Sequence, residues 1–343
     1  MLLLCLACAR PNLPPPTPGA PPRIPSPQSS LYVAVSEVPR DPLVANAWPH
    51  QVDEGLSGAA AAIGMTVSAA GGLPAGELRW RAILAGYPWP IRLASVASVE
   101  TEQLPVQLLA LAEQHQPTGD VGLVRTRDGE MDRWVLLVGE PGGQLAGFAR
   151  EVAPGASLSF GGYQVRTSEP DGDLVMSSGA AAFTGVGEYL VELSLNGKKA
   201  GSFPIYAGAP TPQAAPFTGT ATAENAGDLD EEVLVRMDAL DTWYKRRPAE
   251  RDPMLDTIAR SRLREWAAAR TLSSATLHLA GAGYLDGFGG FCRGATVADC
   301  LDAMWWSVDD RAALAAPMSS VGWAAQPAAG GVAVVVVGQR TGL

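Results

Sequence analysis

The sequence predicts an α+β protein in which two similar α/β regions flank a small all-β region. Two stretches far apart in the chain repeat one pattern, a short strand containing Val-Gly, a turn, and an apolar strand that ends in glycine. Between them, from about residue 144 to residue 208, short strand patterns alternate with Gly and Asp turns and no helical period is present. A repeated unit this long indicates a duplicated domain, because solenoid repeats run to only ~20–50 residues. The repeated stretches are Asp120–Val124 with Trp134–Gly139, and Ser320–Ala324 with Ala333–Gly338.

Length and charge set the outer limits of the interpretation. The chain has 343 residues, enough for two or three domains of roughly 100–150 residues each. Its formal net charge of −10 argues against nucleic acid as a partner, since nucleic-acid binding requires clustered Lys and Arg. The basic run Lys245–Arg247 is too short to change this, and we interpret it as a solvated helix end.

The N-terminus predicts export. Residues 1–8 are apolar, and Leu6–Cys8 resembles the end of a bacterial lipoprotein signal peptide, in truncated form, with Cys8 as the lipidated residue. Residues 9–30 form a linker with nine prolines between positions 11 and 28, typical of an extended polyproline II spacer. We therefore expect an extracytoplasmic protein, lipid-anchored in the bacterial envelope or secreted. Its contact with the membrane would be through this anchor alone.

The first α/β region is expected over residues 31–143. Apolar residues at helical spacing, such as Leu104, Leu108 and Leu111, predict helices that alternate with strands of continuous apolar character. A proline opens the second helix, where its missing N–H costs nothing. The expected helices are Leu56–Ala70, Pro74–Leu84 and Thr101–Gln114, and the expected strands are Val121–Val124 and Trp134–Val138.

Residues 144–208 predict a small immunoglobulin-like β-sandwich. The clearest element is a hairpin, in which Glu188–Leu195 is followed by Asn196-Gly197 and a return strand to Tyr206. Asn-Gly between alternating apolar residues is the strongest short-range hairpin signal. The further expected strands are Ala156–Phe160, Tyr163–Thr167, Leu174–Ser177 and Ala181–Phe183.

After a linker over residues 209–227, the chain predicts a second α/β domain over residues 228–343. Cys292 and Cys300 lie in it without a nearby second Cys or His pair, so a zinc site is disfavoured. In an exported protein they would form a disulfide. The expected helices are Leu229–Leu240, Pro253–Arg270 and Val297–Trp306, and the closing strand is Val332–Val337.

The segment Met304–Leu314 reads Met-Trp-Trp-Ser-Val-Asp-Asp-Arg-Ala-Ala-Leu. With Val321-Gly322 and the valine-rich last strand, it resembles the CAP superfamily, the cysteine-rich secretory, antigen 5 and pathogenesis-related group (SCP-like). The resemblance implies a three-layer α-β-α sandwich over residues 228–343. By the internal repeat, residues 31–143 would be a degenerate second copy. The fold class expected is thus CAP-like α-β-α sandwiches flanking a small immunoglobulin-like sandwich.

Many members of that superfamily carry two His and two Glu that bind a divalent metal in a central cleft. In this chain Asp310 stands where the motif His is expected, and His278 is left as a relic. The resemblance implies His278, Ser307, Asp310 and Arg311 as ligand-cleft candidates, and we expect neither catalytic residues nor a metal or cofactor. From its position, Arg311 is expected to tie the third helix to a neighbouring loop.

Adjacent tryptophans on a helix cannot share one face. Trp305 and Trp306 therefore indicate either an exposed anchor for a ligand or packing between domains. The function we expect is non-catalytic binding or scaffolding, with an unidentified envelope protein or glycan as the partner. Two alternatives are a hydrolase acting on peptide or glycan through the CAP cleft, and a purely structural envelope stalk.

Overall fold

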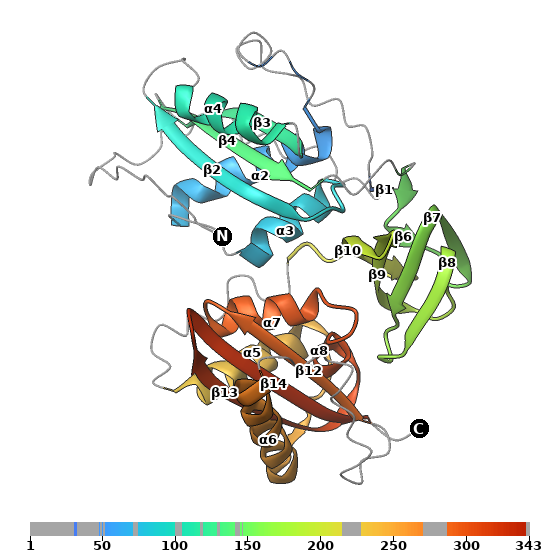
Figure 1. Cartoon of the computed structure of the whole chain (residues 1–343). Helices are drawn as coiled ribbons and strands as arrows, with labels where there is room; N and C mark the ends of the chain where they lie inside the picture. The colour runs from blue at the N-terminus through green and yellow to red at the C-terminus, as the bar shows by residue number, and fades with distance from the viewer. Residues whose placement is uncertain are drawn as a thin grey trace. The chain divides into compact units, whose positions relative to one another are not determined.

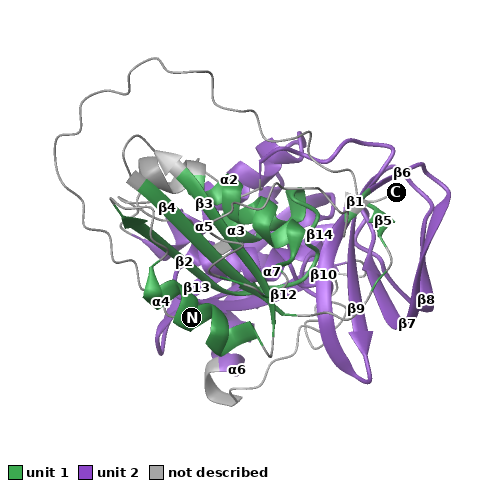
Figure 2. Cartoon of the chain, turned by 90° about the horizontal axis from the view of Figure 1, so that it is seen from above, with its two compact units in different colours: residues 1–150 green, residues 151–343 purple. Residues whose placement is uncertain are grey.

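The computed structural model contains both helices and sheets, so the α+β class is confirmed (Figure 1). It divides into two compact units, Met1–Arg150 and Glu151–Leu343 (Figure 2). Among the helices in the described part of the chain, none is both long and apolar enough to cross a membrane. The described residues are 31–32, 48, 50, 52–70, 75–99, 105–116, 119–128, 131–140, 145, 147–214, 228–269 and 287–340.

The first unit is built on a three-stranded antiparallel sheet in the order β2-β4-β3. Helix α4 packs on one face, where Leu108 and Ala112 join a core with Leu123 and Leu136. Helix α2 lies against β3 and β4 and crosses closest at Gly122. The bounds are α2 Glu54–Ala70, α3 Ala75–Leu84, β2 Ile91–Val99, α4 Val106–His115, β3 Asp120–Asp128 and β4 Met131–Gly139, with a separate pair of β1 Leu31–Tyr32 and β5 Phe148–Ala149.

The second unit begins with a five-stranded sheet in the order β6-β10-β9-β7-β8. The predicted hairpin joins β9 to β10, and Asn196 (φ 52°) and Gly197 (φ 74°) both adopt the left-handed conformation that a tight hairpin turn requires. All five strands belong to one sheet, so the two-sheet immunoglobulin-like sandwich is not confirmed. The bounds are β6 Glu151–Val152, β7 Ala156–Ser168, β8 Leu174–Phe183, β9 Gly187–Leu195 and β10 Lys198–Ala207.

In two places the sequence predicts two short strands where the structure has one long strand. The expected break between Phe160 and Tyr163 lies within β7, where Gly161 has a φ of 61° and the register with β8 shifts. The expected break between Ser177 and Ala181 likewise lies within β8, which runs through Gly179 with a φ of 72°. Glycine at these points marks a bend of a continuing strand, which sequence patterns do not distinguish from a loop.

The rest of the second unit is a four-stranded sheet in the order β11-β13-β14-β12, with helices on both faces. Helix α6 covers one face through Leu255, Ala259 and Leu263, which pack on Val335 and Val337. Helices α7 and α8 cover the opposite face, and α5 contacts β13, α7 and α8. The bounds are α5 Leu229–Trp243, β11 Glu250–Arg251, α6 Pro253–Ala269, β12 Gly287–Gly294, α7 Val297–Trp305, α8 Ala312–Ala315, β13 Met318–Ala328 and β14 Gly331–Arg340.

The disulfide expected from the sequence is present. Cys292 of β12 and Cys300 of α7 are bonded, with their Cα atoms 5.1 Å apart. The side chain of Thr296 caps α7 by accepting a hydrogen bond from the Asp299 amide at 3.1 Å. Cap and disulfide together fix the start of α7 on the edge strand of the sheet.

The glycine-rich segment Gly287–Gly294 is strand β12, which sequence analysis did not predict. A Cβ on Gly290 would lie 2.7 Å from the sulfur of Met304 and 3.0 Å from the Cβ of Ala313. The strand is glycine-rich where α7 and α8 pack directly on it, so a pattern that normally disfavours strands is required here by packing. Strand β2, also not predicted, has no clear apolar alternation and is half-buried along most of its length.

The internal repeat of the sequence corresponds to a repeated arrangement of elements. If α3 in the first unit and the short α8 in the second are left aside, a helix, a strand, a second helix and a hairpin follow one another in both units, and the last strand is central in both sheets. In each unit the residue just before a helix is hydrogen-bonded to the strand beside it. The amide of Asp53 donates to the Val121 carbonyl at 2.8 Å, and the amide of Asp252 donates to the Val321 carbonyl at 2.9 Å. The next residue along each strand is the repeated glycine, on which a Cβ would lie 2.6 Å from the Cβ of a leucine in the first turn of the helix, Leu56 against Gly122 and Leu255 against Gly322.

Candidate functional site

The predicted motif residues lie between the end of α7 and the start of α8. Helix α7 ends at Trp305, and after it the amide of Trp306 donates to the Asp302 carbonyl and that of Ser307 donates to the Met304 carbonyl, each at 3.1 Å. Residues 306–311 form the turn that follows, and Arg311 precedes the first residue of α8. Trp305 and Trp306 are 0% and 4% exposed, so packing accounts for both tryptophans and neither is an exposed anchor.

Arg311 is the centre of a buried polar network. Its Nη2 donates to Oε1 of Glu188 on β9 and, at 3.4 Å, to the hydroxyl of Tyr244. Its Nη1 donates to the Trp305 carbonyl at 3.2 Å, and the guanidinium lies 4.1 Å from the centroid of the Trp305 ring. The Trp305 indole donates to the same Tyr244 hydroxyl at 2.9 Å. The residue predicted to tie the third helix to a loop therefore connects it to a distant strand as well.

Burial dominates the electrostatics of this network. Loss of water raises the pKa of Glu188, while Arg311 and a hydrogen bond from Tyr206 oppose that rise. Burial acts to lower the pKa of Arg311, but Glu188, Tyr244 and Tyr206 together outweigh it, so the pKa of Arg311 lies above its ordinary value. Burial also raises the pKa of Tyr244. Arg311 remains charged and engages Glu188, Tyr244 and a backbone carbonyl.

Ser307 and Asp310 form a second, local contact. The Ser307 hydroxyl donates to Oδ2 of Asp310 at 2.6 Å, and the Phe291 amide donates to Oδ1 at 3.1 Å. Burial raises the pKa of Asp310, and these two hydrogen bonds oppose the rise. Asp310 thus braces the turn against β12.

Of the predicted cleft residues, the structure brings together Ser307, Asp310 and Arg311 on this one turn. His278 lies outside the described residues, as does the predicted lipidation site Cys8. Within the part of the chain that the structure describes, no three His, Cys, Asp or Glu side chains are grouped so that they could hold a metal ion. The ligand-cleft assignment remains a prediction.

Further contacts join the same turn to the five-stranded sheet. The Ser202 hydroxyl donates to the Trp306 carbonyl at 3.0 Å, and Arg166 pairs with Asp309. Arg166 also pairs with Glu192 at 3.1 Å. A peripheral pair, Arg340 with Asp173, links the two regions at 2.6 Å. Except for Arg166 and Glu192, these partners are more than a hundred residues apart in sequence, so no local pattern could have predicted them.

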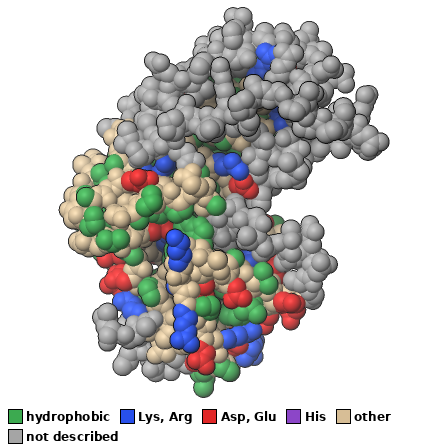
Figure 3. Space-filling model, turned by 180° about the vertical axis from the view of Figure 1, so that it is seen from behind, with side chains coloured by type: hydrophobic (Ala, Val, Ile, Leu, Met, Phe, Trp, Pro, Cys, Tyr) green, Lys and Arg blue, Asp and Glu red, His purple; other side chains and the backbone are tan. Residues whose placement is uncertain are grey.

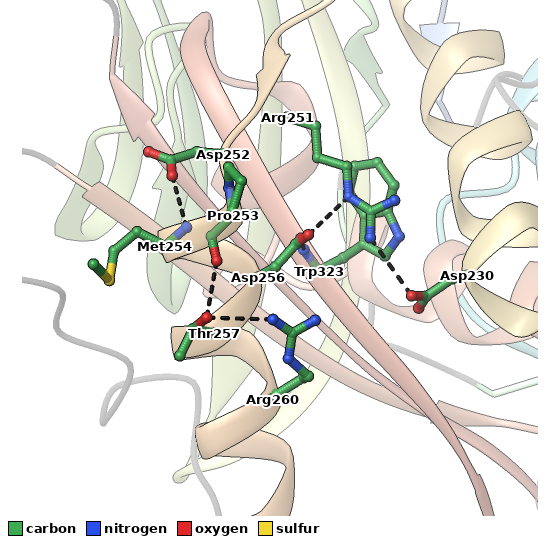
Figure 4. Close-up of polar contacts among 9 residues, drawn as sticks. All are labelled: Asp230, Arg251, Asp252, Pro253, Met254, Asp256, Thr257, Arg260 and Trp323. Carbon is green, nitrogen blue, oxygen red and sulfur yellow. Dashed lines mark hydrogen bonds and ion pairs between the residues drawn. The ribbon is translucent and has the colours of Figure 1, made fainter.

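A small pocket lies between α5 and the strands β11 and β13. On its wall the Arg251 guanidinium stacks 4.1 Å from the Trp323 ring centroid, and Arg251 pairs with Asp256 at 3.0 Å and Asp230 at 3.5 Å (Figure 4). Asp256 also accepts the Trp323 amide at 3.0 Å. The cavity volume is about 50 Å³, which suits a few waters at most, whereas ligand sites usually measure ~300–1,000 Å³.

A wider, open depression of about 480 Å³ adjoins it. Arg246 is already engaged there, with Asp241 at 2.5 Å and with the carbonyl groups of Leu314, Ala315 and Ala316. The exposed charges of the depression are Arg247 and Glu250. Its lining residues are Arg246, Arg247, Pro248, Glu250, Pro317, Met318 and Ser319.

The first unit contains a polar cluster that sequence analysis did not detect. The Tyr87 hydroxyl donates to Asp120 at 3.1 Å and to the Glu140 carbonyl at 3.3 Å. Burial raises the pKa values of Tyr87, Asp120 and Asp53. Tyr87 lies over Gly139 of the central strand, and in the second unit Met318 lies over the equivalent Gly338. The two repeats therefore differ in polarity at this point.

No protein-family model, curated protein or solved structure matches this chain.

Proposed function

We propose that this chain is a non-catalytic binding or scaffolding protein of the bacterial cell envelope. The observation that carries the proposal is the buried ion pair between Arg311 and Glu188. A catalytic cleft needs polar side chains that face a substrate. Here Ser307, Asp310 and Arg311 make hydrogen bonds to their own chain, and Arg311 attaches the five-stranded sheet to the C-terminal α/β region through Glu188. These contacts favour a structural role for the motif.

The C-terminal region supports a CAP-like origin. Its sheet carries α6 on one face and α7 and α8 on the other, the three layers that the resemblance implies. The first unit repeats the order of elements and the order of its three strands. We therefore extend the CAP-like proposal to residues 31–143 as a degenerate copy.

One contact supports an immunoglobulin-like origin for residues 144–208. The Tyr189 hydroxyl, two residues after the start of β9, accepts a hydrogen bond from the Gly185 amide at 2.7 Å and donates to its carbonyl at 3.1 Å. Immunoglobulin-like domains often hold the turn before a late strand through such a tyrosine corner. The single sheet would then be a reduced form of that fold.

The disulfide between Cys292 and Cys300 supports an extracytoplasmic location, because disulfides persist mainly in oxidising compartments. Lipidation of Cys8 would place the chain on the membrane surface, with the linker over residues 9–30 as spacer. The partner we propose is an envelope glycan or protein. The open depression beside Arg247 has the volume for a short glycan or peptide end.

Cosedimentation of the full chain with insoluble cell-wall glycan tests the glycan form of this proposal. We expect the protein to pellet with the glycan, and the supernatant to contain no new soluble fragments by mass spectrometry. Ser307→Ala and Asp310→Asn, both outside the depression, should pellet equally well. Fragment release by the wild type that these variants lose would establish the hydrolase instead. Absence of pelleting would contradict glycan binding.

A further inference from the structure

Strand β8 differs from the other sheet edges of the described chain. A free strand edge presents unpaired amide and carbonyl groups, and proteins usually protect such edges with charge, proline or short length. Strands β2, β3 and β12 each carry at least one Arg. Strand β11 has only two residues and pairs with Ser320 and Val321 alone, and the rest of β13 contains Pro327. Strand β8 has ten residues, Leu-Val-Met-Ser-Ser-Gly-Ala-Ala-Ala-Phe, and none of them is charged.

The first half of β8 is exposed on both faces of the sheet. Leu174, Val175 and Met176 are 43%, 45% and 72% exposed, and Ser177 and Ser178 are exposed as well. Neighbouring side chains of a strand point to opposite faces, so both faces of this edge offer apolar surface. In Figure 3 the surface at the left, where the five-stranded sheet lies, carries hydrophobic side chains amid uncharged surface.

The opposite edge of the same sheet is protected. Strand β6 has only two residues, and the carboxylate of Glu151 accepts a hydrogen bond from the Thr211 amide at 2.8 Å. The part of β10 that β6 leaves unpaired carries Lys198, Lys199 and Pro204. The contrast between the two edges indicates that β8 is kept free for pairing.

We propose that β8 is a dimerisation edge, where a second copy of this chain adds its own β8 in antiparallel orientation. Charge selects a second copy as the occupant. The chain has a net charge of −10, so two copies repel except where they meet through a neutral segment. Asp173, at one end of β8, is already paired with Arg340. Antiparallel pairing puts the two Asp173–Arg340 pairs at opposite ends of the interface, where they do not oppose each other.

The strand is also self-complementary in shape and polarity. A two-fold axis at Met176 opposes Leu174 with Ser178 and Val175 with Ser177 across the pair, and the two Met176 side chains meet at the axis. Such an isologous contact closes after two copies, and the two five-stranded sheets become one continuous sheet. An interface made by one strand is small, so we expect a weak dimer with a Kd on the order of micromolar.

Sedimentation velocity of the full chain over a roughly hundredfold concentration range tests the dimer. We expect a shift from monomer to dimer as the concentration rises. Met176→Lys should raise the Kd by more than about tenfold, because the two lysines would bring like charges together at the two-fold axis. Val186→Lys is the matched control, since Val186 is 67% exposed in the same unit but lies outside β8, and it should leave the Kd unchanged. A wild type that stays monomeric, or a dimer unaffected by Met176→Lys, overturns the proposal.

Disulfide trapping gives a second measurement that does not depend on how the lysine variant folds. Single cysteines are placed at positions 174–178 in a Cys5→Ser, Cys8→Ser background, and each variant is oxidised in dilute solution. A covalent dimer that forms strongly with one of these cysteines and not with Val186→Cys supports antiparallel pairing. No covalent dimer from any of the five positions contradicts it.

Discussion

Arg311 and Glu188 form a buried ion pair although 123 residues separate them in the sequence. Their side chains are 2% and 9% exposed, and the pair joins the turn before α8 to strand β9. Two regions with different sheets are thereby connected by a contact that excludes water. Loss of either partner leaves the other buried without its counter-charge, which makes this contact sensitive to mutation.

We predict that Arg311→Met lowers the free energy of unfolding of the second unit by about 3–5 kcal/mol, the usual cost of an orphaned buried charge. The double variant Arg311→Met, Glu188→Met should lose less unfolding free energy than Arg311→Met alone, because it leaves no buried charge without its partner. Urea denaturation followed by tryptophan fluorescence measures both. The more exposed pair of Arg340 and Asp173 provides the control. Asp173→Asn should lower the free energy of unfolding by less than about 1 kcal/mol. Equal losses in Arg311→Met and Asp173→Asn would contradict this interpretation.

The close approach of helix and strand at Gly322 gives a second prediction. An added methyl group would lie 2.6 Å from the Leu255 Cβ, so Gly322→Ala must separate α6 from β13. We expect a loss of about 1–3 kcal/mol or more in the free energy of unfolding. Gly162→Ala is the matched control, since a Cβ there meets nothing within 4 Å, and it should be nearly neutral. If both variants unfold at the same urea concentration, the close packing at Gly322 contributes nothing.

The disulfide between Cys292 and Cys300 closes a loop with a sequence separation of 8. Chain-entropy reasoning assigns such a short loop roughly 2–3 kcal/mol of stabilisation. Cys292→Ala with Cys300→Ala should therefore lower the melting temperature, and a reductant should have no further effect on that double variant. The wild type should resist reduction while folded, because both cysteines are buried. Rapid modification of the folded, reductant-treated protein by a thiol reagent would show that this edge of the sheet opens easily.

Asp310 gives a prediction for pH. Its pKa lies above the ordinary value of 3.8, chiefly because of burial, so the folded state holds this proton more tightly than the unfolded state does. The resulting stabilisation is complete below 3.8 and is lost as the pH rises through the folded value. The unfolding free energy of the wild type should fall over this range relative to Asp310→Asn, by urea denaturation at a series of pH values. Ser307→Ala removes a hydrogen bond that lowers the pKa of the folded state, so it should extend the fall to higher pH. If the unfolding free energies of the wild type and Asp310→Asn differ by the same amount at every pH, the raised pKa of Asp310 is refuted.

Local patterns predicted most helices and the strands whose residues follow the expected periodicity. Helix α2, predicted from Leu56 and observed from Glu54, and the Asn196-Gly197 hairpin both depend on neighbouring residues in the sequence. Strand β12 was missed because its glycines reflect contact with α7 and α8 rather than strand propensity. Patterns within one segment do not contain that information.

For the site, the sequence identified a motif and left its partners unknown. Ser307 and Asp310 contact each other within one turn, so their proximity follows from sequence spacing. The partner of Arg311 on β9 depends on how two separate sheets meet, and nothing near Glu188 in the sequence indicates it. The Tyr87 and Asp120 cluster was missed for the same reason, since it forms only when β3 lies beside the turn after α3.

The position of the last strand in each α/β sheet affects the order in which the protein can fold. In the first unit β4 lies between β2 and β3, and in the second β14 lies between β12 and β13, yet each is made after both of its neighbours. During synthesis the two neighbours of the central strand cannot pair with it until it emerges, and of these neighbours only β13 has another strand to pair with, the two-residue β11. Each sheet must therefore form late and in one step, with its apolar strands exposed until then. A factor that shields unfolded chains would act in this interval.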